Sequence, residues 1–477
     1  MTRSGSPGWR GTFGEEITVA SVRRLAVGVA RHLLAAKRAG RGVLVGFDAR
    51  FLSARLAREV GETLATLGVP AQVASAPLPT AAVAQAVVAG RRALGVVLTA
   101  GAAPAETGGV LLIGPDGGPA GEALRQEIER LAAAGPPHGV AAAGRPTTRA
   151  RRATPVRRAS LKNVDPWPGY LRHLARSARR AGVRRSRLPI VCDARGGAAG
   201  GRLAPALAPA GRAITRLNDA PHPSFAEGGP DCAEPQLAEL ARAVRRDAAV
   251  LGLAVDGDGG RFGVVDRGGA AIPANLVVAL LAEWLLEHGL PAGALARTVA
   301  TTHLVDDLAR RHGRAVVETP VGFAHLAPLL ADRSAALACE EEGGLALGTH
   351  LPLRDGLFAA LLMVAMTAAR RASLADQARA LFARLGARHG RRIDYHVDAA
   401  ARARMIRRLE DPPSVIAGRR VAALDVPDGP RVTFEDGSWL LVRDAAADQV
   451  ARCHLETRTR ADLDAITNAV RELLGRP

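Results

Sequence analysis

Cysteines are few in this chain of 477 residues, and they lie far apart: Cys192, Cys232, Cys339 and Cys453. None belongs to a C-x-x-C pair, which argues against a disulfide framework and a zinc knuckle. Long apolar runs are also missing. No run approaches the roughly 20 residues of a membrane-spanning helix, and the first residues lack the apolar stretch of a secretory signal. We therefore expect a cytoplasmic protein without a membrane partner.

Lysine and aromatic residues are scarce as well. Lys37 and Lys162 are the only lysines, so arginine supplies nearly all the positive charge behind the formal net charge of +18, and aromatic residues make up 3% of the chain. A positive charge of this size raises nucleic-acid binding as an alternative function. However, the densest arginine stretch, 145–187, offers Trp167 and Tyr170 as its only aromatic residues that could stack on bases. We expect diffuse solvated charge, with nucleic acid an unlikely partner.

The hydrophobic content of 48% is ample for packed cores, and the chain is too long for a single one. The first third alternates between helical and strand patterns, as in βαβ units. The pattern predicts helices over 19–38, 52–67, 80–89 and 121–134, and strands over 42–47, 71–74, 95–98 and 110–113. Residues 135–166 are rich in Pro, Gly, Ala and Arg without periodicity, which is typical of a linker.

Beyond this linker the pattern predicts helices over 168–181, from 274 onward and over 355–371, and strands over 188–192, 249–255, 298–301, 315–317 and 337–339. The tail shows strands at 393–397, 431–434 and 439–442, the last two joined as a hairpin, and a helix over 460–474. This order predicts an α/β protein: three similar mixed α/β domains, at 1–155, 156–269 and 270–388, and a C-terminal α+β domain at 389–477.

Asp256 and Asp258 follow the apolar run 249–255, in a sequence Asp-Gly-Asp-Gly-Gly-Arg that ends at Arg261. Two carboxylates at this spacing, separated by glycine at the end of a strand, can face one hard cation such as a magnesium ion shared with a phosphate. An ordinary Asp/Gly turn that closes a strand has the same composition. The spacing alone leaves both interpretations open.

Several segments, in order along the chain, resemble motifs of the α-D-phosphohexomutase superfamily, the phosphoglucomutases and phosphomannomutases. These segments are residues 8–11, 47–53, 256–261, 321–323, 340–344 and 439–457. The resemblance implies four domains around a central cleft. It also implies transfer of a phosphoryl group between the C1 and C6 oxygens of a hexose phosphate, through a phosphorylated serine, bound magnesium and a bisphosphorylated sugar.

The segment that corresponds to the family's phosphoserine loop, Thr-Ala-Ser-His-Asn-Pro, here reads Thr-Ala-Gly-Ala-Ala-Pro over residues 99–104. Gly101 stands at the phosphoserine position and has no side chain to phosphorylate. Leu111 stands where relatives have a lysine that serves proton transfer. Thr99 is the nearest hydroxyl, but it is displaced by two residues, and phosphoryl transfer tolerates about 1 Å of misplacement poorly. We therefore assign no catalytic residue, with Thr99 a weak substitute.

The metal and sugar motifs have also changed. Gly260 stands at the third aspartate of the family's metal loop, so Asp256 and Asp258 remain as ligands and magnesium binding should be weak or lost. Glu342, beside Glu340, replaces the family's serine in the sugar loop. Its charge should either repel an anionic phosphosugar or belong to a solvated acidic turn.

The phosphate loop of relatives reads Arg-Pro-Ser-Gly-Thr-Glu-Pro, whereas residues 443–449 here read Arg-Asp-Ala-Ala-Ala-Asp-Gln. The hydroxyl donors are gone, and Asp444 adds repulsion beside Arg443. The expected substrate-binding residues are Arg10, Arg261, Glu340, Glu342, Arg443 and Arg452.

Together these motifs predict a phosphohexomutase-like protein that has lost mutase activity and retains sugar-phosphate or protein binding. The alternatives are an active phosphoglucomutase or phosphomannomutase with a rebuilt site and, from another class, a nucleic-acid-binding protein. The sequence specifies neither the hexose nor a protein partner.

Overall fold

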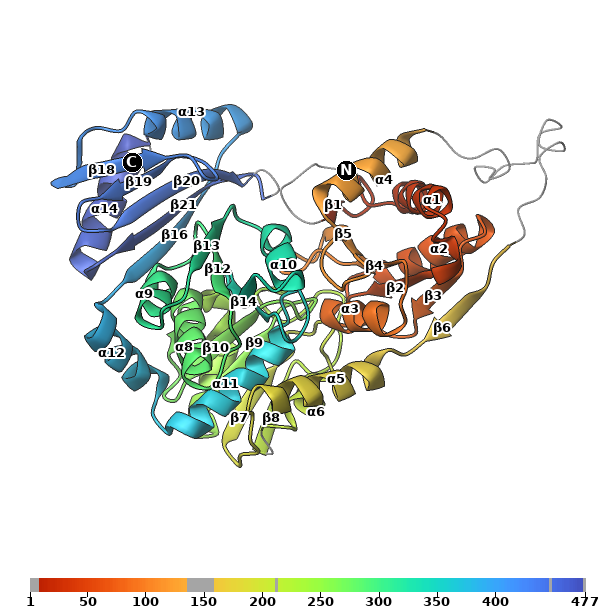
Figure 1. Ribbon diagram of the computed structural model, residues 1–477, viewed down its shortest axis with the longest axis horizontal. Helices are drawn as coiled ribbons and strands as arrows, with labels where there is room; N and C mark the ends of the chain where they lie inside the picture. The colour runs from red at the N-terminus through yellow and green to blue at the C-terminus, as the bar shows by residue number, and fades with distance from the viewer. Residues whose placement is uncertain (1–7, 135–157, 211–212, 446–447, 475–477) are drawn as a thin grey trace.

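The chain folds into four β-sheets with their helices, described by a computed structural model for residues 8–134, 158–210, 213–445 and 448–474. In Figure 1 the first sheet lies at one end of the molecule and the fourth at the other, with the second and third between them. The first three sheets mix parallel and antiparallel strands, and the fourth is antiparallel. The predicted combination of mixed α/β units and a C-terminal α+β unit is confirmed.

The first sheet has the strand order β1-β5-β4-β2-β3-β6. Its strands are β1 (Gly8–Thr12), β2 (Val43–Phe47), β3 (Ala71–Ala74), β4 (Leu94–Leu98), β5 (Thr107–Ile113) and β6 (Leu161–Val164). Its helices are α1 (Val19–Ala35), α2 (Ser53–Thr66), α3 (Thr80–Ala89) and α4 (Glu122–Ala133). The helix α5 (Trp167–Arg180) follows the sheet and packs against α3 (Figure 1).

Strand β6 lies inside the segment expected to be a linker, so that expectation was wrong for residues 161–164. It extends the first sheet by pairing in parallel with β3. Its four residues, Leu-Lys-Asn-Val, alternate only weakly and are none of them buried, so they gave no strand signal. The remainder of the predicted linker, up to residue 157, lies outside the described residues.

The second sheet has the order β11-β10-β9-β7-β8. Its strands are β7 (Pro189–Asp193), β8 (Ala213–Leu217), β9 (Leu251–Val255), β10 (Phe262–Asp266) and β11 (Ala271–Ile272), and its helices include α6 (Leu203–Leu207) and α7 (Ala238–Arg246). Strand β9 is buried over its whole length and runs directly into Asp256. The predicted strand at 249–255 is therefore present, two residues shorter at its start.

The third sheet has the order β13-β12-β14-β15. Its strands are β12 (Ala294–Thr298), β13 (Val316–Thr319), β14 (Ala335–Cys339) and β15 (Leu345–Leu347). Its helices are α8 (Ala274–Glu287), α9 (Leu304–Arg311), α10 (Phe323–Ala331), α11 (Gly356–Arg370) and α12 (Leu374–Leu385).

The predicted strand over 298–301 was misplaced, because β12 ends at Thr298 and a turn follows it. Arg297 explains the error. It breaks the apolar pattern of β12, yet it is 3% exposed, because its guanidinium is paired with Asp306 and Glu318. A buried arginine of this kind has no signature in hydrophobic periodicity.

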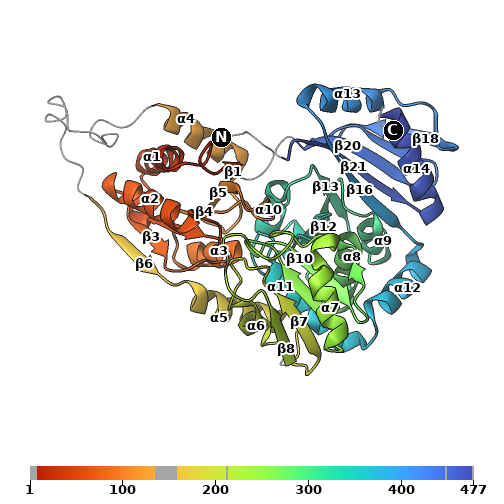
Figure 2. The same ribbon diagram turned by 180° about the vertical axis from the view of Figure 1, so that it is seen from behind.

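The fourth sheet has the order β16-β21-β20-β19-β18-β17. Its strands are β16 (His389–His396), β17 (Val415–Ile416), β18 (Arg419–Asp425), β19 (Arg431–Phe434), β20 (Trp439–Ala445) and β21 (Val450–Thr457). Helices α13 (Ala399–Glu410) and α14 (Arg460–Leu473) complete the unit (Figure 2). The predicted β19–β20 hairpin and the terminal helix are confirmed.

The apolar helix α11 belongs to the core, and nearly all of its residues are buried. Asp355 caps it by accepting hydrogen bonds from the backbone N–H groups of Leu357 and Phe358. In the described part of the chain, no single helix is long and apolar enough to cross a membrane, and α11 and α12 reach that length only as a pair bent by 80°.

Candidate functional site

The loops that follow β4 and β9 come together beside the first residues of α3 and α11. The backbone N–H of Thr80 donates to the carbonyl of Asp258 at 2.9 Å, and the N–H of Gly356 donates to the carbonyl of Gly259 at 2.9 Å. A Cβ on Gly257 would lie 2.8 Å from the carbonyl oxygen of Gly101. The structure therefore places the segments expected to carry the nucleophile and the metal in direct contact.

Arg50 holds the loop after β4 in shape. Its guanidinium is buried and pairs with Asp48, Nε to Oδ2, at 3.0 Å. It also donates to the backbone carbonyls of Gly101, Ala103, Pro104 and Thr107. Hydrogen bonds to backbone carbonyls do not depend on the loop's side chains, so they persist whichever residue stands at position 101.

The second sheet repeats this arrangement. Asp193 is the last residue of β7, and Asp48 is the first residue after β2, so the two aspartates have equivalent positions. The backbone N–H of Arg195 donates to Asp193 at 2.7 Å. The Arg195 guanidinium donates to the carbonyls of Glu227, Gly229 and Gln236. Two sheets thus use the same Asp-x-Arg device to shape a loop beside the cleft.

Gly101 occupies the tip of the loop with φ at +61°. A Cβ at this position would point into the cleft, 3.6 Å from Nη2 of Arg10 and 4.0 Å from Oδ1 of Asp258. A side chain here would therefore face both a cation and a carboxylate. Glycine leaves that position without any reactive group.

The Thr99 hydroxyl, expected as a weak substitute, is hydrogen-bonded inside the loop. Thr99 is 5% exposed, its oxygen accepts a hydrogen bond from the N–H of Gly101 at 3.0 Å, and its side chain hydrogen-bonds the buried Asp48 carboxylate. This hydroxyl is committed to the interior of the loop. Leu111, which the resemblance places at the family's lysine, lies within β5 and pairs with β1 and β4.

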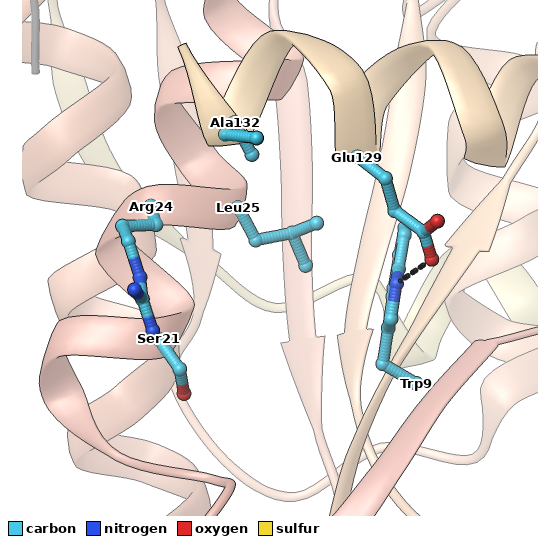
Figure 3. Close-up of a pocket in the computed structure, with 7 residues that line it drawn as sticks. Trp9, Ser21, Arg24, Leu25, Glu129 and Ala132 are labelled. Carbon is cyan, nitrogen blue, oxygen red and sulfur yellow. Dashed lines mark hydrogen bonds between the residues drawn. The ribbon is translucent and has the colours of Figure 1, made fainter. Parts of the chain in front are cut away.

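Arg10 reaches the cleft because its neighbour anchors β1 on the opposite side. Trp9 is buried and its Nε1 donates to Glu129 of α4 at 2.5 Å (Figure 3). A cavity of about 270 Å³ lies beside this contact, between α1 and α4. Since side chains alternate along a strand, Arg10 faces the other way, toward Gly101. Burial and the nearby Arg261 lower the pKa of Arg10 to about 10, so it stays charged.

Residues 256–261, which follow β9 and which we call the acidic loop, use their carboxylates mostly to bind the loop's own backbone. Asp256 Oδ1 accepts from the N–H groups of Gly260 at 2.7 Å and Arg261 at 3.1 Å. Asp258 Oδ1 accepts from Gly260 N–H at 3.2 Å, and its Oδ2 accepts from the Thr80 hydroxyl at 2.7 Å. Asp256 Oδ2 is buried without a hydrogen-bond partner among the described residues. Burial and the adjacent Asp258 raise the pKa of Asp256 to about 8.

These residues do not fit a resident magnesium ion. Magnesium requires a near-octahedral set of oxygens, and the loop offers two carboxylates, of which one oxygen is unengaged. Within the described residues, no group of three or more His, Cys, Asp or Glu side chains could hold a metal. A glycine at position 260 leaves space that Arg354 fills: a Cβ there would meet Arg354 Nε at 3.2 Å.

Arg354 was not among the residues expected from sequence. It precedes the cap of α11 and pairs with Glu340, Nη1 to Oε1, at 2.6 Å. Glu340 raises its pKa against the effect of burial, and Asp256 and Asp258 act in the same direction. The acidic loop thus has a guanidinium as its neighbouring cation.

Glu342 is paired with arginines, so the interpretation as a solvated acidic turn is wrong, and the expected repulsion of a phosphosugar stays a prediction. Its carboxylate forms ion pairs with Arg261, Arg392 and Arg452. The positive charge of these arginines, led by Arg261, holds the pKa of Glu342 well below its usual range, although burial opposes the effect. Arg392, on β16, was a second residue that the sequence did not single out.

The remaining arginines expected to bind phosphate are also engaged by carboxylates. Arg452 pairs with Asp394 at 2.8 Å and Asp448 at 3.0 Å, and Arg443 lies 3.8 Å from Asp428. Asp444, expected to repel a phosphate beside Arg443, instead pairs with Arg402 of α13 at 2.8 Å. Residues 446 and 447 of this segment lie outside the described residues.

A cavity of about 830 Å³ opens behind the Glu341–Glu342 turn. Residues of the second, third and fourth sheets and their helices line it. The predicted residues therefore form two adjacent groups, one of Arg10, Gly101, Asp256 and Asp258 and one of Glu342, Arg261 and Arg452, and the charge of Arg261 acts on both Arg10 and Glu342.

Known protein families provide an independent comparison. Sequence models of phosphoglucomutase/phosphomannomutase α/β/α domains I, II and III match residues 1–137, 168–269 and 273–385. The phosphoglucomutase/phosphomannomutase of Thermococcus kodakarensis is 27% identical over 95% of this chain and 94% of its own. The phosphoglucosamine mutase of Rhodospirillum centenum is 30% identical over 76% of each chain. A solved structure from Thermus thermophilus, named as a candidate phosphomannomutase, superposes with a TM-score of 0.82 at 27% identity, covering 99% of this chain and 98% of that one.

Proposed function

We propose that this chain, which belongs to the phosphoglucomutase/phosphomannomutase family, binds a hexose phosphate in its cleft but does not carry out the family's phosphoserine-dependent mutase reaction. Gly101 is the observation that carries the proposal. The phosphoryl group must be held covalently between its two transfers, and the position that faces Arg10 and Asp258 has no atom to hold it.

A second loss supports the same conclusion. Backbone N–H groups and the Thr80 hydroxyl donate to both carboxylates of the acidic loop, leaving only Asp256 Oδ2 without a partner among the described residues, and Arg354 is the neighbouring cation. A magnesium ion, if bound, would neutralise charge on a transferring phosphoryl group. A fixed guanidinium can attract a phosphate, but it activates no nucleophile. We therefore expect ligand binding to be independent of magnesium.

The side chains of the cleft can still bind a hexose phosphate. Arg10 faces Gly101 and can attract a phosphate at that end, while the Glu340 carboxylate can accept hydrogen bonds from sugar hydroxyls. Guanidinium groups bind phosphate oxygens with good geometry and stay charged at neutral pH. The ligand class that fits is a hexose with one phosphate, held and not converted.

Two measurements on the purified protein test the proposal. Calorimetry with glucose 1-phosphate and glucose 6-phosphate should detect binding that does not change when magnesium is chelated, and Arg10→Ala should weaken it. A coupled mutase assay with glucose 1-phosphate, glucose 1,6-bisphosphate and magnesium should stay at background. Turnover well above background would support the alternative of an active mutase with a rebuilt site, and the absence of any binding would remove the binding function.

A further inference from the structure

Three arginines from different segments converge on one carboxylate. Arg261 follows the acidic loop of the second sheet, whereas Arg392 and Arg452 lie on β16 and β21 of the fourth. We call Arg261, Arg392 and Arg452 the arginine trio. Glu342, in the turn after β14 of the third sheet, contacts all three. One side chain thus joins the second, third and fourth sheets.

Arg392 and Arg452, the two arginines of the trio that lie on the fourth sheet, share one face of that sheet. Arg452 stands opposite Asp394 of β16, and Arg392 stands opposite His454 of β21. Side chains two residues apart on a strand point to the same side, so Arg392, Asp394, Arg452 and His454 form one polar row. The alternate residues of β21, including Cys453 and Leu455, pack into the core of the fourth unit. The polar row therefore faces Glu342.

Proteins commonly bind phosphate with several guanidinium groups that point at one anion, and here the anion is a carboxylate. Here the charge of the trio is already balanced. Asp394 pairs with both Arg392 and Arg452, Asp448 pairs with Arg452, and Glu342 pairs with all three arginines. While all these ion pairs are formed, an additional phosphate would lie close to their carboxylates. The repulsion between the negative charges would make its binding unfavourable.

We propose that the Glu342 carboxylate is a built-in anionic ligand of the arginine trio, which keeps the phosphate group of a bound sugar out of that end of the cleft. A phosphate reaches the trio only when Glu342 leaves it. Glu342 therefore determines specificity: the cleft accepts a sugar with one phosphate, bound near Arg10, and discriminates against a sugar with phosphates at both ends. The inference rests on the proposed function, because it takes a hexose phosphate as the ligand.

Replacement of Glu342 tests the inference directly. Glu342→Ser removes the carboxylate and leaves room, and Glu342→Gln removes the charge at nearly constant volume. We expect glucose 1,6-bisphosphate to bind Glu342→Ser about tenfold or more tightly than the wild type, a difference of about 1.4 kcal/mol. Glucose 1-phosphate should change much less. Inorganic phosphate should raise the melting temperature of both variants more than that of the wild type, because it replaces the lost anion.

Glu283→Gln is the matched control. Glu283, on α8, is a buried carboxylate that pairs with Arg370 and Arg384 and does not line the cavity beside Glu342. Its loss removes one carboxylate partner from two arginines, as the loss of Glu342 removes one from the trio, but phosphate should not restore stability selectively. Unchanged bisphosphate affinity in Glu342→Ser and Glu342→Gln would overturn the inference, and so would an equal phosphate effect in Glu283→Gln.

The proposed function and the inference can fail separately. Mutase turnover by the wild type would remove the proposed function, and the ratio of bisphosphate affinities between Glu342→Ser and the wild type would still decide the role of Glu342. If Glu342→Ser does not fold, Glu342→Gln supplies the same ratio, and a ratio of one refutes the inference.

Discussion

The residues that support the cleft from beneath and the residues at its surface differ in the contacts and side chains that they provide. Beneath it, Arg50 still binds Asp48 and four loop carbonyls, and Arg195 repeats the pattern in the second sheet. At the surface, Gly101 and Gly260 have no functional side chain, and the Glu342 carboxylate pairs with the arginine trio. The fold depends on the first set of contacts and catalysis on the second, so each can change without the other.

Loss of Arg50 should have the largest effect on stability. Arg50→Ala leaves the buried Asp48 carboxylate without its cation and removes the guanidinium donor from four loop carbonyls, so we expect a loss of about 3–5 kcal/mol in the free energy of unfolding. Chemical denaturation measures it. Arg55→Ala, at an exposed position on α2, is the control and should change stability little. A loss below about 1 kcal/mol for Arg50→Ala would show that the loop does not depend on this device.

His303 should make the junction of the third and fourth units sensitive to acid. Burial, with Arg297 and Arg388 nearby, lowers its pKa to about 3. The unfolded chain takes up the proton below about pH 6.5 and the folded protein does so only near pH 3, so stability falls as the pH decreases across this window. His303→Phe should remove part of this loss, on the order of 1–3 kcal/mol at pH 4.

Denaturation of wild type and His303→Phe at pH 7 and pH 4 checks this prediction. His396→Phe, at an exposed site on β16, is the control and should follow the wild type. Parallel pH dependence of His303→Phe and wild type would exclude His303 as the source of the effect.

Thr80 connects the first unit to the acidic loop of the second. Its hydroxyl donates to Asp258 at 2.7 Å, both residues being buried. Thr80→Val keeps the shape and removes the donor, so we expect a loss of about 1–3 kcal/mol, because a buried carboxylate oxygen is left unsatisfied. Thr80→Ser, which keeps the hydroxyl, should recover most of it. Equal stability of the valine and serine variants would argue against the hydrogen bond.

Gly101→Ser should have the smallest effect on stability and none on activity. The φ of +61° places position 101 in the left-handed region, where a serine costs about 1 kcal/mol. The hydroxyl would face Arg10 and Asp258, but the metal loop and the lysine position remain altered, so mutase turnover should stay at background. Robust turnover of this variant would show that the other changes matter little.

The sequence predicted the order of elements well, because hydrophobic periodicity marks strands such as β9 and helices such as α11 directly. It placed β12 incorrectly, because the buried Arg297 depends on Asp306 and Glu318 for its position in the core. The absence of a side chain at Gly101 and Gly260 was readable from the sequence. The engagement of Glu342 with Arg392 was not, since these residues are 50 positions apart and meet only in the folded chain.

Direct phosphorylation of the protein tests the central claim most simply. The wild-type chain is incubated with glucose 1,6-bisphosphate and magnesium, and its intact mass is then measured, with an active phosphoglucomutase treated in parallel. Our account predicts that the active enzyme gains a phosphoryl group and that this chain does not. A stoichiometric phosphoryl adduct on this chain, at Thr99 or at any other residue, would contradict it.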